Sequence, residues 1–383
     1  MHRYRLIDGL RALAALLVLT AHVAFWTGTS NLDVVGAVLA RGDAGVAIFF
    51  AISAFLLLRP WLRAAATGGP RPEVGVYAVR RVARIAPAYW LAFVGVLLIA
   101  TIWPATGGIG GAAKVLQNAF LLQAYTGNTY QGFSQTWSLT TEVAFYVLVP
   151  WLGGALGRSV RRSKRGAYTW LAAIALAGVA AQGITAAWTA ANPTAHAGAL
   201  GMSVVGHAAW FAAGAAVAVA LETGDLARLQ AVGIGTWWSA AAVLLLFAAT
   251  GVAGPWDLRA PSVPQALAKE ALYAAIGGLL VLGAARGPSD DRWRAVAASP
   301  ATRFAGDISY GVFLWHLPVI QLIYVIGDQP IFTGSFAAVV FATLIFSVLI
   351  AWASAALVEL PILRWAHRST SRARPDREPA RRA

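Results

Sequence analysis

Long apolar runs, separated by short polar and basic segments, repeat along almost the whole chain of 383 residues. A helix needs about 20 largely apolar residues to cross a membrane, because each residue rises about 1.5 Å and the hydrocarbon core is about 30 Å thick. The pattern therefore predicts ten transmembrane helices, at Ile7–Thr27, Asp43–Leu62, Val82–Trp103, Ser138–Leu156, Tyr168–Ala190, Ala199–Leu221, Thr236–Ala253, Ala266–Ala285, Phe304–Ile326 and Ser335–Val358.

The composition agrees with an all-α integral membrane protein. Hydrophobic residues make up 58% of the chain and charged residues only 12%, whereas soluble domains carry about 25% charged residues. The chain has no cysteine, which excludes disulfides, a thiolate nucleophile and cysteine-ligated metals.

Basic residues predict the orientation of these helices. Cytoplasmic loops of membrane proteins are enriched in Lys and Arg. If the N-terminus is cytoplasmic, every one of the 30 Lys and Arg residues falls on the cytoplasmic side except Arg41, Lys114, Arg259 and Lys269. We therefore expect both termini in the cytoplasm. The basic cytoplasmic loops also account for the net charge of +14, so this charge does not indicate that the protein binds nucleic acid.

The sequence predicts one domain followed by a C-terminal tail. Residues 1–365 are predicted to form a single transmembrane domain, whose first helix is not a cleaved signal peptide. Residues 366–383 form a basic tail with too few apolar residues to pack, so we expect this tail to be disordered. We expect no additional extracytoplasmic domain after the last helix.

The first helix carries two ionisable residues in its apolar run, Arg11 and His22. Their spacing of eleven residues places them on one face, about 16 Å apart along the axis. Arginine offers forked donors to phosphate, and histidine can accept a proton near neutral pH. The alternative is that Arg11 anchors the helix in the interface and His22 is a packing residue.

A second cluster precedes the third helix. Arg81 and Arg84 share a face beside Pro87, which suits a ligand with several phosphates. Charge that only sets the orientation, or contact with anionic lipid headgroups, explains the cluster equally well.

The fourth helix carries Ser138, Glu142 and Tyr146 on one face. Glu142 is the only acid in that span, and a buried carboxylate needs a donor. Both Glu142 and His22 fall in the outer half of the membrane, where the two side chains could meet. We therefore expect Glu142 to orient the His22 imidazole. A structural carboxylate bonded to a neighbouring helix is the rival interpretation.

The ninth helix carries Ser309 and His316 on one face, and Pro318 frees the carbonyl of Leu314. A kink beside a histidine fits a binding cavity, although core packing is an equal alternative. His207 has no charged neighbour on its own helix face, and no residues have metal-ligand spacing.

Together and in this order, these stretches resemble the acyltransferase-3 family of membrane O-acyltransferases, which modify bacterial surface sugars, lipids and macrolide-type natural products. Two positions depart from the family pattern: Ala47 stands where an acid is common, with Asp43 as a candidate substitute, and Ala54 where glycine is usual. The matching positions are Arg11 and His22; Gly45, Val46, Phe49, Phe50, Ser53 and Phe55; Arg81 and Arg84; Trp137–Tyr146; and Ser309–Pro318.

The resemblance implies a multi-pass enzyme of the bacterial plasma membrane, surrounded by lipid, with His22 as catalytic base and the arginines holding the acyl donor. We expect acyl-CoA, with acetyl or another short acyl group, to place its phosphates on Arg11, Arg81 and Arg84. Its pantetheine arm would then run between the helices to His22. We expect no metal, and we expect substrate or oxyanion contacts from Ser53, Ser138, Tyr146, Ser309 and His316.

The acceptor is then a hydroxyl of a macrolide-like natural product or of a glycan or glycolipid. The rival function is a secondary transporter or lipid flippase, which also uses buried His, Glu and Arg. Such proteins often contain two related halves, and the sequence contains no internal repeat.

Overall fold

Every regular element of the structure is helical in the described residues, which are 4–192, 198–229, 231–286 and 291–372 of a computed structural model. The helices are α1 Arg5–Trp26, α2 Val34–Ala40, α3 Ala44–Thr67, α4 Val74–Ile102, α5 Ala112–Ala119, α6 Gln123–Thr126, α7 Trp137–Arg162, α8 Lys164–Ala191, α9 Gly198–Gly201, α10 Ala208–Glu222, α11 Ile234–Phe247, α12 Val263–Ala285, α13 Asp291–Ala298, α14 Pro300–Ile326, α15 Phe336–Ser354 and α16 Leu360–Arg372.

Nine runs of the described residues are long and apolar enough to cross a membrane, which confirms the all-α, multi-span prediction. They are Arg5–Trp26, Val34–Thr67, Val74–Ile102, Gln131–Arg162, Lys164–Ala191, Ile234–Val252, Val263–Ala285, Pro300–Ile326 and Phe336–Thr370.

The sixth predicted span, Ala199–Leu221, is only partly helical. Its helix α10 has 15 residues, and the short α9 and a turn precede it. The side chain of Gln182 donates to the carbonyls of Gly201 and Gly206, and Thr141 donates to that of Met202. Irregular backbone at membrane depth is tolerated where other protein groups satisfy it, and these bonds do so.

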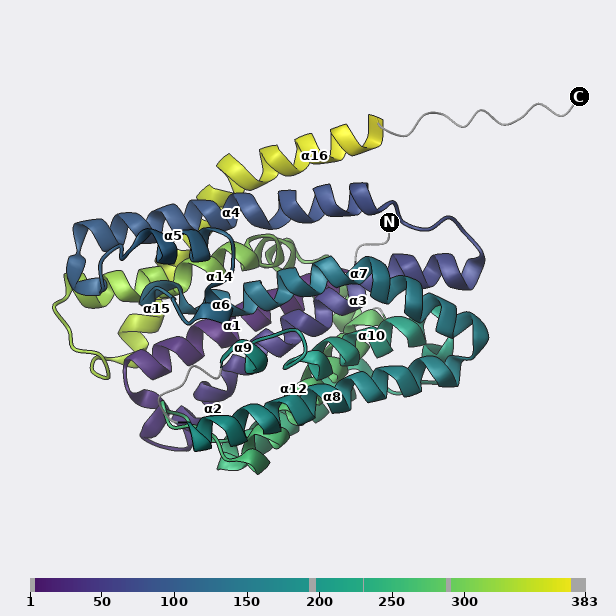
Figure 1. The fold of residues 1–383 in the computed structure, drawn as a ribbon, viewed down its shortest axis with the longest axis horizontal. Helices are drawn as coiled ribbons and strands as arrows, with labels where there is room; N and C mark the ends of the chain where they lie inside the picture. The colour runs from purple at the N-terminus through teal and green to yellow at the C-terminus, as the bar shows by residue number, and fades with distance from the viewer. Residues whose placement is uncertain (1–3, 193–197, 230, 287–290, 373–383) are drawn as a thin grey trace, which may run out of the picture.

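The long helices run side by side (Figure 1), and α1, α3 and α14 form the interior of the bundle. α1 packs against both α14 and α3, and α3 also packs against α7 and α10. The spans containing α3 and α14 are more buried than those of α8, α11 or α15. Polar side chains on α1, α3 and α14 therefore face protein, where they can form a site.

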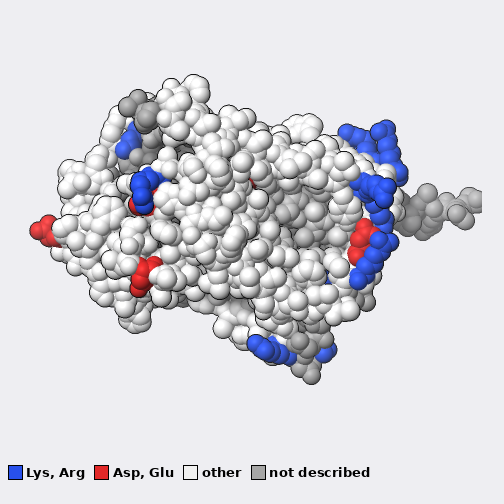
Figure 2. Space-filling view, turned by 90° about the horizontal axis from the view of Figure 1, so that it is seen from below, with Lys and Arg blue, Asp and Glu red and all other residues white. Residues whose placement is uncertain are grey.

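Charged side chains gather at the two ends of the bundle, and Figure 2 shows an almost uncharged band between them. Most of the blue surface lies at the end where α3 and α7 finish and α4 begins, which we call the basic end. The described chain also begins and finishes at this end (Figure 1). An apolar band between charged ends is the surface expected of a membrane-spanning protein.

The last helix continues further than the sequence suggested. α16 lies along α4 (Figure 1) and includes residues 366–372, which were assigned to the tail. Ala366 and Thr370 are buried, and Arg80 donates to the Thr370 hydroxyl. These few contacts suffice because α4 supplies a packing surface. Residues 373–383 lie outside the described residues.

Close packing of α3 against α10 depends on Gly214. A methyl group at this position would lie 2.0 Å from the carbonyl oxygen of Ala51. We expect Gly214→Ala to destabilise the protein by about 1–3 kcal/mol, because the two backbones must move apart.

Thermal unfolding in detergent measures the effect of Gly214→Ala on stability. Gly235→Ala is the control, since no atom lies within 4 Å of the added methyl group, and equal melting temperatures for both variants would contradict the prediction.

Candidate active site

Two histidines from neighbouring helices meet inside the bundle. Nδ1 of His22, on α1, lies 3.1 Å from Nε2 of His316, on α14, and the ring centroids are 5.0 Å apart. His316 is completely buried, whereas His22 is partly exposed to internal cavities. The pairing was not predicted, because it depends on how α1 and α14 are rotated against each other.

Hydrogen bonds to backbone carbonyls indicate which ring nitrogen of each histidine carries the proton. Nδ1 of His22 lies 2.9 Å from the carbonyl oxygen of Val18, and Nδ1 of His316 lies 3.2 Å from that of Val312. A carbonyl oxygen can only accept, so both Nδ1 atoms carry the proton in the neutral rings. Nε2 of His316 is then an acceptor, and the single Nδ1–H of His22 is shared between it and the Val18 carbonyl as a bifurcated bond. Nε2 of His22 keeps its lone pair and bonds to no described residue.

His22 lies where two cavities meet. One, of about 190 Å³, is also lined by Gln135, Trp137 and Met202. The other, of about 320 Å³, is lined by Asp43, Gln131 and aromatic residues from α1 and the loop before α12. Both are far larger than the ~10–15 Å³ that one water needs. The imidazole therefore faces space that a substrate can occupy, and not lipid.

Glu142 does not contact His22, so the prediction that it orients the imidazole is wrong. Its carboxylate accepts hydrogen bonds from the hydroxyls of Ser53 and Tyr146, the second at 2.7 Å. Helical spacing placed Glu142 and Tyr146 together correctly. The rotation of α7 turns both toward Ser53 on α3 and into range of Arg11 on α1, and His316 takes the position next to His22.

The remaining predicted serines are tied to nearby backbone. Ser138 donates to the carbonyl of Gln135 at 3.0 Å, and Ser309 to that of Gly306 at 2.8 Å. Neither bonds to His22. His316 has both ring nitrogens engaged, which does not support its predicted role as an oxyanion donor.

The carbonyl that Pro318 frees in α14 is bonded by a residue that the sequence did not single out. The side chain of Gln135 donates at 2.9 Å to the carbonyl of Leu314, the group that Pro318 was predicted to free. Gln135 also lines the smaller His22 cavity. The bond therefore fixes the part of α14 that presents His316.

The three predicted donor-binding arginines lie within electrostatic range of one another. Arg11 interacts with both Arg81 and Arg84. Their carboxylate partners are loose: Arg11 lies 3.5 Å from Asp8, and Arg84 lies 3.9 Å from Glu359. Nε of Arg81 is buried without a hydrogen-bond partner. Guanidinium N–H groups therefore converge here with spare capacity for an anion.

The His22 cavities do not extend to these arginines. None of the three arginines lines either His22 cavity. A separate space of about 30 Å³ lies between α3, α7 and α14, beside Glu142 and Ser138. Phe49 and Phe313 line it and meet edge to face at 5.8 Å, and the Phe313 ring lies 5.9 Å from that of His316. The Phe313 ring therefore lies beside both this small space and His316.

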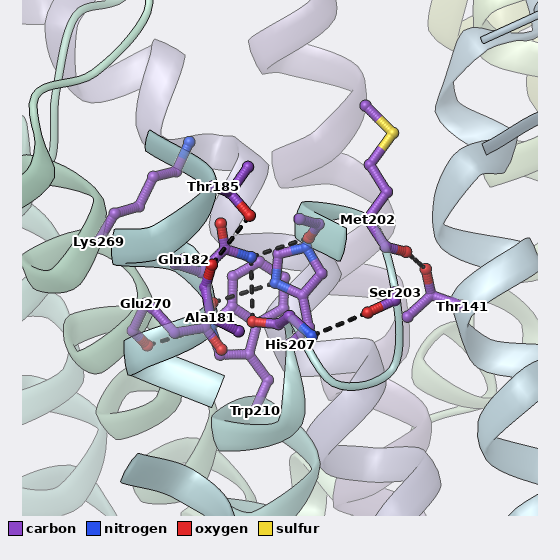
Figure 3. A network of polar contacts seen from close by, with 12 residues as sticks. Thr141, Ala181, Gln182, Thr185, Met202, Ser203, His207, Trp210, Lys269 and Glu270 are labelled. Carbon is purple, nitrogen blue, oxygen red and sulfur yellow. Dashed lines mark hydrogen bonds and ion pairs between the residues drawn. The ribbon is translucent and has the colours of Figure 1, made fainter. Parts of the chain in front are cut away.

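A second pair of a histidine and an acid lies near the smaller cavity, and Figure 3 shows the side chains of this pair. Nδ1 of His207 is 3.0 Å from the Glu270 carboxylate, whose other oxygen has no partner. The His207 ring packs against Trp137, which lines the cavity. His207 was not selected from the sequence, because its acid partner comes from another helix, α12. Glu270 within an apolar span was the signal that could have revealed the pair.

The larger cavity contains another unpredicted cluster. The Asp43 carboxylate accepts from Lys269 at 2.6 Å and from the Tyr273 hydroxyl. Arg41, nearby, is fully buried and donates to the carbonyls of Ala248 and Gly254. Lys269 therefore compensates the charge of the Asp43 carboxylate on the cavity wall.

A family model described as an acyltransferase domain, the acyltransferase-3 model, matches residues 4–355. The chain belongs to the acyltransferase-3 family. No curated protein and no solved structure matches the chain. This acyltransferase carries its five motif stretches on α1, α3, α4, α7 and α14, which surround the His22 site and the arginine cluster. The carboxylate of Asp43, one turn before Ala47, lines the His22 cavity.

Proposed function

We propose that this membrane acyltransferase moves a short acyl group from acyl-CoA to a hydroxyl of an acceptor, with His22 as the general base. One observation carries the proposal: the bonds to Nδ1 leave Nε2 of His22 unprotonated and unbonded, in a ring that lines two cavities. Such a nitrogen can take a proton from a hydroxyl, a role that contributes about 10²- to 10⁴-fold in rate.

The reaction follows from this arrangement. The acceptor oxygen forms a bond to the thioester carbonyl carbon while its proton moves to Nε2 of His22. The C–S bond then breaks, and the departing thiolate takes the proton from the imidazolium. Val18 and His316 stabilise the charged ring, because its Nδ1–H donates more strongly than that of a neutral ring. The products are an ester and free coenzyme A.

The donor enters from the basic end, which we place in the cytoplasm of a bacterial plasma membrane, where acyl-CoA is available. Its phosphates bind Arg11, Arg81 and Arg84, since arginine suits phosphate geometry. The thioester reaches His22 once the side chains of Phe49 and Phe313 move apart. The 30 Å³ space beside them suits an acetyl or similarly short acyl group.

The acceptor occupies the 320 Å³ cavity at the other end. Aromatic rings of Phe25, Trp26 and Trp256 line it together with Asp43 and Gln131. Aromatic faces combined with carboxylate and amide groups suit a ring that bears several hydroxyls. A glycan, a glycolipid or a sugar on a macrolide-like product meets this description.

Purified protein in detergent, supplied with acetyl-CoA, tests the proposal. We expect slow release of the coenzyme A thiol without acceptor, faster release with hydroxyl-bearing candidates, and an acetylated product in mass spectra. A transporter of unrelated cargo would release no thiol. Absence of both thiol release and a coenzyme A-dependent thermal shift would refute acyl-CoA as the donor.

A further inference from the structure

A hollow opens at the basic end between the last turns of α3 and α7, and we call it the glycine hollow. Its volume is about 70 Å³, several times the space of one water. It lies apart from both His22 cavities and contains none of the predicted site residues. Its lining consists of Trp61, Ala64, Ala65, Gly68, Gly69, Arg71, Gly153, Gly154, Gly157, Arg158 and Arg161.

The three arginines of the hollow have no carboxylate partner among the described residues. This distinguishes them from three other cations at the same end. Arg59 and Arg63 both bind Glu222, at 2.8 and 3.2 Å, and Lys164 binds Asp225. Three unpaired guanidinium groups around one depression create a local excess of positive charge that attracts an anion.

The glycines make the hollow by removing side chains. A methyl group at Gly153 would lie 2.5 Å from the Trp61 ring, and one at Gly157 would lie 2.9 Å from Ala65. These two glycines therefore let α3 and α7 approach closely. A methyl group at Gly154 would lie 3.6 Å from Nη1 of Arg158, so this guanidinium lies directly over the glycine floor.

The hollow continues the donor route outward. The Arg158 guanidinium is level with Gly154, about 12 Å along α7 from Tyr146. Tyr146 interacts electrostatically with Arg81 of the donor cluster. Arg71 lies in the segment between α3 and α4, and α4 carries Arg81 and Arg84. The hollow therefore lies further toward the basic end than Tyr146, on α3 and α7, and Arg71 connects it to α4.

We propose that the glycine hollow binds the 3′-phosphate on the ribose of coenzyme A. This inference rests on the proposed use of acyl-CoA. In coenzyme A the ribose separates the pyrophosphate from the 3′-phosphate, so a donor whose pyrophosphate binds Arg11, Arg81 and Arg84 needs a separate site for its last phosphate. Arginine forks match the geometry of a terminal phosphate. An anionic lipid headgroup offers the same chemistry, and the experiment must separate the two.

Binding of coenzyme A and of 3′-dephospho-coenzyme A tests the proposal by calorimetry in phosphatidylcholine nanodiscs. We expect the parent to bind coenzyme A roughly tenfold more tightly or better. In Arg158→Gln and Arg161→Gln the ratio falls toward one, while the affinity for 3′-dephospho-coenzyme A stays unchanged. Arg162→Gln is the matched control, an exposed arginine on α7 that does not line the hollow, and it keeps the parental ratio.

Each contrary outcome has its own meaning. Equal affinity of the parent for both ligands, or variants that weaken both ligands alike, overturns the 3′-phosphate site and leaves the acyl-CoA proposal standing. No binding of either ligand overturns both proposals. If the variants keep the parental ratio but lose thermal stabilisation by phosphatidylglycerol, the hollow binds lipid headgroups and the inference is wrong.

Discussion

Replacing His22 by alanine is expected to lower the acyl-transfer rate by about 10²- to 10⁴-fold, because the acceptor hydroxyl loses its general base. The side chain lines two cavities, so its removal enlarges existing space and leaves the core packing intact. The variant leaves Nε2 of the buried His316 without its donor, so we expect it to fold with a melting temperature lowered by only a few degrees in detergent. The rate of thiol release with a hydroxyl acceptor is the measurement.

Added imidazole provides a control for this variant, because the 190 Å³ cavity has room for a free ring. We expect imidazole to restore part of the rate in His22→Ala but not to accelerate the parent. The companion change His316→Leu should lower the rate by about 10- to 100-fold, since it removes one charge-assisted hydrogen bond. Near-normal turnover of His22→Ala would disprove the assignment of the base.

Removing the charge of Arg81 or Arg84 is expected to weaken acyl-CoA binding by about 10- to 100-fold for each change to glutamine. A hydrogen bond to a charged group contributes about 1.5–3 kcal/mol, and tenfold in affinity corresponds to about 1.4 kcal/mol. Both contacts lie far from the reacting atoms, so we expect KM to rise and kcat to change little. Initial rates over a range of acetyl-CoA concentrations separate the two constants.

Arg259→Gln is the matched control for these variants. Arg259 is an exposed arginine that pairs with Asp257. It does not belong to the cluster of Arg11, Arg81 and Arg84, and it does not line the small space beside Glu142. Its loss should leave KM unchanged. If Arg81→Gln and Arg84→Gln also bind coenzyme A like the parent, the donor phosphates lie elsewhere. A fall in kcat alone would mean that the arginines act on the reaction and not on the donor.

Residues that share a helix were predicted more reliably than residues that share a cavity. Glu142 and Tyr146 were placed on one face and do bond to each other, and the carbonyl freed by Pro318 does receive another donor. The expected contact between Glu142 and His22 is absent, because it required the rotations of α1 and α7 as well as their depths. His207 and Glu270 were missed because they lie on different helices.

The sequence by itself determined the helical, membrane-spanning architecture, the basic end and the ionisable residues inside the bundle. Burial of apolar side chains and exclusion of charge act on each segment separately, so a single chain displays them. Only the tertiary structure decided that His22 meets His316, that Ser53 and Tyr146 hold Glu142, and that Phe49 and Phe313 pack edge to face beside Glu142. Those contacts depend on helix rotation and close packing between distant segments, which periodicity along one helix does not specify.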